Sequence, residues 1–402
     1  AVFAGQNSRV GGVDIVGVTR IIDQLAENRL LAETGMQGGT TTMRASMEAV
    51  ELAFPEPSDD GLAAIIDDFF GGFSDLAARP GDSATRAQVL ERAQTLVDGL
   101  HRAAGDLQTV ADTAKGAITD LASDANSIAQ QIAELNKAIT GSATAANDLT
   151  DQRDTLIRQL SELTGADPRP QGSGSVDVYI GGRAIVSGNY VFGLDGAGGV
   201  LRWSADGSNV VAPPSKAASL AATINDVVPR YQSMLDGVAA GLVTQINTLH
   251  NAGYDPTGAT GLDFFDPAGV TATSISISSD VAGQPNKIAA GAPVFPGPTA
   301  PGPLDGEQAR AMAALADSTT GPGSLYRSLV STLGVEARTA IRRDSIQGTV
   351  TAAAEQTANS VGSVSLDEEM ASLVATQRAY EANARVLNVV NDLMGTLINI
   401  GR

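Results

Sequence analysis

An unbroken seam of apolar side chains constrains the fold of this chain more than any other feature. Its members follow one another at spacings of three and four residues, at positions 107, 110, 114, 118, 121, 125, 128, 132, 135 and 139. Such a seam predicts a helix that packs along another at a shallow angle. Extended from about Thr85 to Thr140, this helix would reach roughly 80 Å at about 1.5 Å per residue. A compact domain has little use for that length, so we expect a rod or coiled coil.

Helical periodicity also covers much of the remaining chain. Breaks at Pro- and Gly-rich clusters separate the segments, and Gly165 is the expected C-terminal stop of one of them. The expected helices cover residues 21–47, 62–76, 147–163, 216–249, and 307 to the C-terminus with a break at 320–323.

Two regions lack this helical period. Residues 176–180 and 183–186 flank Gly181-Gly182, which is a hairpin signal, and further strands are expected at 190–194 and 200–203. Residues 251–303 are loop-rich, with one expected strand at 273–278. Residues 9–19 alternate apolar and polar side chains, and we expect a short extended segment there.

We therefore expect a mainly α fold with β insertions. Its centre is a discontinuous long-helix rod or bundle domain, which carries small β-rich side domains and ends in a coiled-coil-type helix. The helical domain is expected to comprise residues 1–165, 215–262 and 305–363. The β-rich insertion domain is assigned to 166–214, a loop- and β-rich segment to 263–304, and the C-terminal axial helix to 364–402.

Charge and composition exclude several partners and locations. The net charge is −19 and there are only four lysines, whereas nucleic-acid binding requires clustered basic residues. An acidic surface also disfavours anionic membranes, and no apolar run reaches the roughly 18 residues of a membrane span. The absence of cysteine fits a chain that crosses redox compartments. The start at Ala1, without a signal peptide, suggests a trimmed or truncated chain.

Motifs of catalysis and metal binding are missing. The sequence has no phosphate-binding loop, nucleophile elbow or dinucleotide fingerprint. His101 and His250 have no second ligand at zinc spacing, and we expect both on helix surfaces. The segment Asn251–Asp263 resembles a calcium loop, but Ala259 replaces a required oxygen donor, so a plain turn is expected. We therefore predict no catalytic residue, no cofactor and no metal.

The C-terminal segment carries the predicted assembly interface. Ser365 and Glu368 form a capping box at the start of a helix. A heptad seam then runs to the chain end, and the polar Gln377 and Asn391 within it can fix register. The predicted interface residues are Leu366, Met370, Leu373, Gln377, Tyr380, Ala384, Leu387, Asn391, Met394 and Ile398.

Residues 363–387 resemble the C-terminal signature of flagellar rod, hook and hook-associated proteins. The match rests on Leu366–Glu369, Gln377, Ala379–Tyr380 and Ala382–Ala384. Three further stretches resemble the hook-associated family at the hook–filament junction. These are residues 17–20, the Asp148–Asp154 segment DLTDQRD, and NTLHNAGYD at 247–255 together with Asp263–Phe265.

The resemblance implies a structural role outside the cell, in the bacterial flagellum. Members are exported uncleaved by the flagellar type III apparatus, with an export chaperone before assembly. They form a ring with copies of themselves on the hook protein, through long terminal helices, and the second junction protein and the filament follow. The family pattern begins with a further N-terminal helix that ends in an Asn-rich turn. This sequence lacks that helix, so we expect a fragment.

Three alternatives to this family differ from it in what they require of the sequence. Flagellin or the second junction protein shares the terminal helices but not the Asp148–Asp154 and 247–255 stretches. A helical adhesion or signalling rod would require a membrane span. An enzyme on an axial scaffold would require catalytic motifs, and the sequence contains neither of these.

Overall fold

The computed structural model describes residues 22–142, 147–294, 300–362 and 366–400. The chain divides into two compact units, of which the larger comprises residues 31–351 and the other comprises 1–30 and 352–402. Each unit is described separately below.

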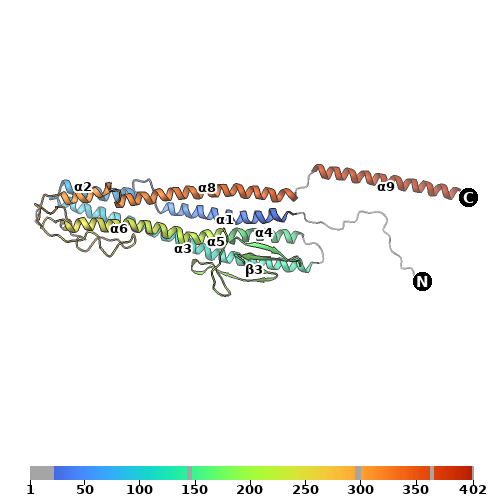
Figure 1. Cartoon of the computed structure of the whole chain (residues 1–402), viewed down its shortest axis with the longest axis horizontal. Coiled ribbons are helices and arrows are strands. Elements are labelled where there is room, and N and C mark those ends of the chain that lie inside the picture. The colour runs from blue at the N-terminus through green and yellow to red at the C-terminus, as the bar shows by residue number, and fades with distance from the viewer. Residues whose placement is uncertain (1–21, 143–146, 295–299, 363–365, 401–402) are drawn as a thin grey trace. The chain divides into compact units, whose positions relative to one another are not determined.

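Helices dominate the described chain, as the seam patterns predict (Figure 1). They are α1 (Gln24–Leu52), α2 (Leu62–Ala78), α3 (Ser83–Gly141), α4 (Asn147–Thr164), α5 (Lys216–Ala222), α6 (Val228–Ala252), α7 (Glu307–Ala313), α8 (Pro322–Gly362) and α9 (Leu366–Ile400). Short 3₁₀ turns are η1 (Ala197–Gly199), η3 (Pro285–Lys287) and η4 (Ala314–Asp317), and η2 (Thr223–Val227) is a π-helical turn.

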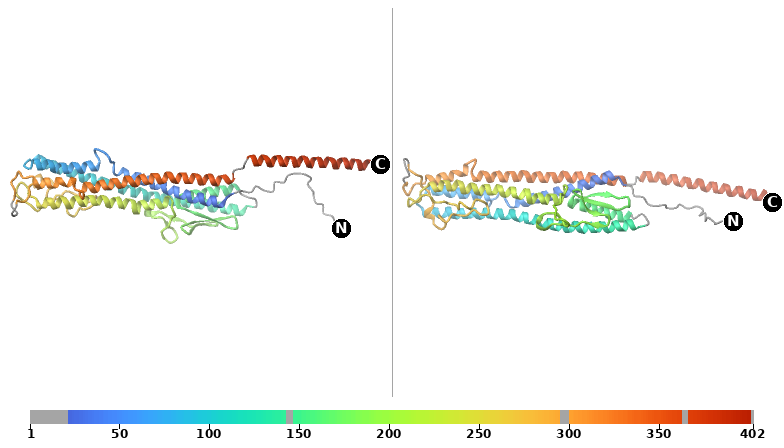
Figure 2. Two further views of the ribbon diagram at one scale, coloured as in Figure 1. Left: turned by 45° about the horizontal axis from the view of Figure 1, so that its top comes forward. Right: turned by 60° about the horizontal axis from the view of Figure 1, so that its bottom comes forward.

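The predicted long helix is confirmed as α3, which has 59 residues. It begins after Pro80-Gly81, where the Asp82 carboxylate accepts the backbone N–H of Ala84 at 3.0 Å and the Thr85 hydroxyl at 3.0 Å. These two hydrogen bonds lower the pKa of Asp82, against the smaller opposing effect of burial. In the larger unit, α1, α2, α6 and α8 run lengthwise in the same bundle as α3 (Figure 2).

An aromatic cluster holds one end of this helical bundle together. Phe69 and Phe73 of α2 meet Phe264 and Phe265 from the loop after α6, with ring centroids 5.3 to 5.9 Å apart. All four rings are fully buried. The two loop residues lie about 190 positions from α2 in sequence. The aromatic cluster therefore joins two distant segments of the chain at this end of the bundle.

A small antiparallel sheet packs on the other half of α3. Its strand order is β1 (Asp167–Pro170), β2 (Val176–Ile180), β3 (Arg183–Ser187) and β4 (Tyr190–Val191), and β5 (Leu194–Asp195) pairs separately with β6 (Arg202–Trp203). Val178 faces Val186 across the central pair, and both are fully buried. The predicted hairpin at Gly181-Gly182 is confirmed, whereas β1 was not predicted.

The mainly α fold class with β insertions is confirmed, but one strand prediction is wrong. Residues 273–278 form no strand, and Ile277 makes only an isolated bridge to Phe265. The Thr271 carbonyl instead accepts the N–H groups of Ser274 and Ile275, which makes a turn. The Ser274 hydroxyl also accepts the N–H of Thr271 at 3.1 Å, and such hydroxyl side chains compete for backbone groups that a strand would need. The predicted domain boundaries stay a prediction.

The helix expected over 216–249 is interrupted by the π-helical turn η2. The first of the resulting helices, α5, is capped by the hydroxyl of Ser215. After the π turn, Pro229 lies at the start of α6. Proline has no N–H to donate into the preceding turn, so the regular ladder of α-helical hydrogen bonds cannot continue through Pro229.

The second unit contains the start of α1, the end of α8 and the whole of α9. Ala26 and Leu30 of α1 bury against Ala354 and Ala358 of α8 in a small cluster. The predicted extended segment at 9–19 and the side chains of Ser365 and Glu368 lie outside the described residues.

Candidate assembly surface

The predicted seam residues lie along one side of α9. Except for Leu366, whose side chain is outside the description, they are all exposed, with Tyr380 at 77% and Leu387 at 68% of full accessibility. At 100° per residue they fall within an arc of roughly 120°. A helix with such an apolar arc in water gains free energy when a partner covers it.

A second apolar row on α9 was missed in the sequence. It consists of Val386, Val389, Val390, Leu393, Leu397 and Ile400, which are also exposed. Its members again recur at spacings of three and four residues, on the side of the helix opposite the seam. The polar strip that remains contains Glu381, Arg385, Asn388 and Asp392. The last turns of α9 are therefore apolar on two sides, a pattern typical of a helix between two neighbours.

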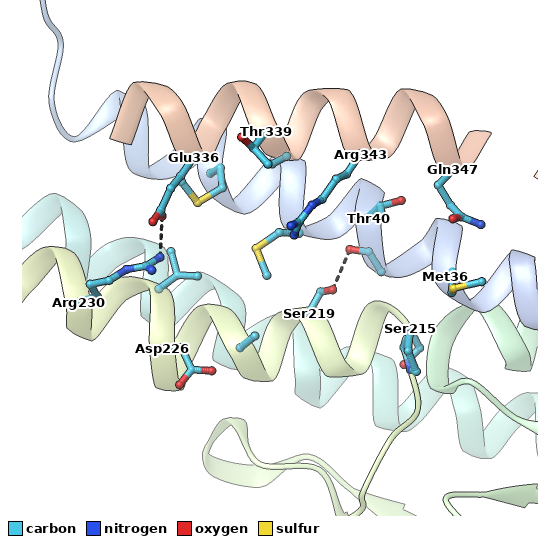
Figure 3. A pocket seen from close by; sticks show the side chains of 17 residues that line it. Met36, Thr40, Ser215, Ser219, Asp226, Arg230, Glu336, Thr339, Arg343 and Gln347 are labelled. Carbon is cyan, nitrogen blue, oxygen red and sulfur yellow. Dashed lines mark hydrogen bonds and ion pairs between the residues drawn. The ribbon is translucent and has the colours of Figure 1, made fainter. Parts of the chain in front are cut away.

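A cavity of about 630 Å³ lies in the larger unit between α1, the α5–α6 segment and α8 (Figure 3). Met36, Met43 and Met47 of α1 line it, and Glu336 of α8 accepts a bond from Arg230 at 2.6 Å. The hydroxyl of Tyr231 donates to the same carboxylate at 2.7 Å. Burial, and then this carboxylate, raise the pKa of Tyr231 above its ordinary value.

Beside this cavity, Asp344 fastens α8 to α1. Its carboxylate accepts bonds from Arg44 at 2.8 Å, Thr41 at 2.7 Å and Gln37 at 2.9 Å. Burial alone would raise the pKa of Asp344, but these hydrogen bonds outweigh it and the pKa is lowered. Arg343, the residue before Asp344 on α8, points into the cavity (Figure 3). No carboxylate among the described residues pairs with it.

The 247–265 stretch fixes a loop to the bundle. The Asn247 side chain donates to the Phe265 carbonyl at 2.8 Å and accepts the N–H groups of Phe264 and Phe265 at 3.0 and 2.9 Å. His250, which we expected on a surface, is fully buried, so that expectation is wrong. The helical spacing could have predicted this burial, because His250 follows Ile246 by four residues and so lies on the same buried side of α6.

His250 is held as a neutral imidazole. Its Nε2 accepts the N–H of Ala289 at 3.0 Å, so its Nδ1 carries the proton and donates to the Leu262 carbonyl at 2.7 Å. Burial lowers the pKa of His250, which favours this neutral form. His101, in contrast, is exposed, as expected. The His101 Nε2 lies 2.9 Å from the carbonyl oxygen of Ile275, so both imidazoles contact loop backbone.

The Asp148–Asp154 stretch fixes the β sheet to the helices. Arg153 of α4 is buried and donates to the carbonyl of Gly174 at 2.8 Å and to Asn136 at 3.2 Å. The Asn136 amide of α3 donates in turn to the carbonyls of Val176 and Gly188, both at 2.8 Å. These motif residues therefore have structural roles inside the molecule.

The calcium-like segment is a plain turn, as predicted. The Oδ1 atom of Asp255 accepts the N–H groups of Thr257 and Ala259 at 2.8 and 2.9 Å, so this oxygen is used internally. Within the described ranges, no group of three or more His, Cys, Asp or Glu side chains could hold a metal ion. The described helices also include none with the length and apolar character of a membrane span.

Comparison with known proteins decides the family. The sequence model described as the flagellar hook-associated protein FlgK helical domain matches residues 47–265, which is more than half of the chain. The chain belongs to the FlgK family of flagellar hook-associated proteins. A second model, for the C-terminal part of flagellar basal body rod proteins FlgEFG, matches residues 356–400 and so contains α9. The resemblance identified in the sequence is confirmed, and this FlgK-family chain is a structural component of the flagellum.

Similar proteins agree with this family over most of their lengths. The flagellar hook-associated protein 1 of Bacillus subtilis is 24% identical over 96% of this chain and 86% of its own length. That of Escherichia coli is 24% identical over 99% of this chain and 93% of its own. The structure of the flagellar hook junction protein FlgK from Burkholderia pseudomallei superposes with a TM-score of 0.71 and 16% identity, covering 84% of this chain and all of that one. It shows that the fold is shared.

Proposed function

We propose that this FlgK-family chain is the structural subunit that joins the flagellar hook to the filament. It would assemble as a ring on the hook protein, after export through the flagellar type III apparatus with a chaperone. The second junction protein and the filament would follow it. The observation that carries the proposal is α9, which falls within the rod-protein match and exposes apolar rows on two sides.

The two apolar rows account for the proposed use of α9. A helix with a single apolar side needs one neighbour, whereas a helix that is apolar on two sides is stable only between two. In a ring of copies, each α9 would lie between helices of adjacent subunits. The polar strip at Arg385, Asn388 and Asp392 would remain toward solvent.

The decisive experiment replaces the gene by single variants and scores filaments and swimming. Leu387→Asp places a charge in the seam, and we expect loss of filaments and of swimming because a buried carboxylate is costly. The matched control is Asn388→Asp, which places the same charge on the polar strip and should leave both intact. Normal filaments in the Leu387→Asp strain would exclude α9 as the assembly element.

Deletion of the gene tests the junction role itself. Cells without the subunit should make hooks that lack filaments and should release filament protein into the medium. Filaments of normal length on such cells would overturn the proposed function.

A further inference from the structure

Within residues 322–351, α8 carries an excess of positive charge on an acidic chain. Both acids of this stretch are engaged inside the protein, Glu336 with Arg230 at 2.6 Å and Asp344 with Arg44 at 2.8 Å. The arginines of the same stretch are Arg327, Arg338, Arg342 and Arg343, and none has a carboxylate partner among the described residues. The chain as a whole has a net charge of −19, so these arginines form a basic area on an acidic molecule.

Three of these arginines form one stripe. At 100° per residue, Arg327, Arg338 and Arg342 lie within an arc of roughly 60° on α8, and all three are exposed. We name them the α8 basic stripe. Val335 and Ile346 lie at its border and are 63% and 58% exposed. The stripe therefore combines cations with apolar surface.

The solvent side of α3 has the complementary character. Six exposed acids lie within an arc of roughly 80°, and we name them the α3 acidic stripe. They are Glu91, Asp98, Asp106, Asp120, Asp124 and Glu134. None of them pairs with a cation in the described part of the chain, and Arg102 is the basic residue among them. In contrast Asp112, outside the stripe, pairs with Lys115 at 2.8 Å.

The two stripes cannot meet within one copy. In the right-hand view of Figure 2, α3 and α8 lie on opposite sides of the bundle within the larger unit. We propose that the α8 basic stripe of one copy docks on the α3 acidic stripe of a neighbouring copy. This inference rests on the proposed assembly and names a lateral contact within it.

The spacing of the charges supports this pairing. Arg338 and Arg342 are four residues apart on α8, as are Asp120 and Asp124 on α3. Two helices laid side by side can therefore form two adjacent ion pairs, and Val335 and Ile346 add apolar contact. Exposed ion pairs add little affinity individually, but a row of them fixes register and excludes wrong pairings.

A contact between two different stripes is heterologous. Each copy keeps one free basic and one free acidic stripe after pairing, so the contact repeats until a ring closes. An isologous contact, in which the same patch meets itself, would stop at a dimer.

Cysteine cross-linking tests this geometry, because the chain has no cysteine of its own. Arg338→Cys is combined in turn with a cysteine at 98, 106, 120, 124 or 134, in cells whose only subunit is the variant. At least one combination should give an oxidant-dependent ladder of dimers, trimers and larger species from isolated flagella. Each single variant should stay monomeric, and a mixture of two complementary single variants should stop at dimers.

Charge reversal supplies the second test. Arg338→Glu with Arg342→Glu should reduce filament number at least tenfold, and adding Asp120→Arg with Asp124→Arg should restore it. These exposed positions should leave the melting temperature of the purified chain within about 2 °C of its unchanged value. Absence of any ladder, or filaments unaffected by reversal, overturns the docking proposal. The junction role would then still stand if gene deletion leaves hooks without filaments.

Discussion

At the scale of single residues, buried polar side chains attach loops and strands to the long helices. Asn136 and Arg153 hold the sheet, and Asn247 and His250 hold the loop after α6. Each satisfies backbone groups that would otherwise be buried without partners. The sequence identified the stretches that contain three of these residues but could not assign their partners, because Leu262 and Ala289 lie 12 and 39 residues from His250.

His250 makes stability depend on pH. Burial lowers its pKa in the folded state, so below the unfolded pKa of about 6.5 the unfolded chain binds more protons than the folded one. Stability is therefore complete above about pH 6.5 and falls as pH decreases toward the lower folded pKa. Melting temperatures measured between pH 7.5 and 5.5 should show this decline.

The matched variants separate titration from packing. His250→Asn should lower the free energy of unfolding by about 1 to 3 kcal/mol at every pH, because the backbone partners of the imidazole lose their hydrogen bonds. It should also flatten the decline of melting temperature with falling pH. The control His101→Asn, at an exposed position, should leave the pH-dependent decline of melting temperature unchanged. A decline of unchanged slope in His250→Asn would show that other groups cause it.

At the scale of elements, local signals predicted the ends of α3 to within two residues. Pro80-Gly81 and the Asp82 cap lie directly before the helix in sequence, and the seam lies within the helix itself. β1 could not be predicted in the same way, because it contains Pro168 and Pro170. Its place at the edge of the sheet, beside β2 alone, tolerates prolines that donate no hydrogen bond.

The hairpin between β2 and β3 gives a test at this scale. Gly181 and Gly182 have φ values of 56° and 88°, which suit glycine in a type I′ turn. A methyl group on Gly182 would meet open space, whereas one on Gly181 would overlap the carbonyl oxygen of Val211. Gly182→Ala should cost about 1 to 2 kcal/mol from the left-handed conformation alone.

Gly181→Ala should cost clearly more than Gly182→Ala, because the Val211 backbone must also move. Urea unfolding of the two variants measures both free energies, and amide exchange in β3 locates the change. Equal costs would show that Val211 gives way without penalty.

At the scale of the whole molecule, the large apolar clusters of the fold and the proposed assembly helix α9 lie in different segments. The large apolar clusters lie within residues 31–351, whereas the described side chains of α9 from Met370 onward are exposed. The seam of α9 was predictable from spacing. The cavity between α1, α6 and α8 was not, because it joins residues about 300 positions apart.

This separation predicts the effect of removing α9. A chain that ends at Gly362 loses no buried apolar area from the described side chains of α9, so its melting temperature should equal that of the full chain. Its filaments should be absent, as in the Leu387→Asp strain. Thermal unfolding of both chains and electron microscopy of the cells measure the two effects. A fall of several degrees in the truncated chain would mean that α9 is buried in solution, and its exposed rows would then serve the fold rather than the junction.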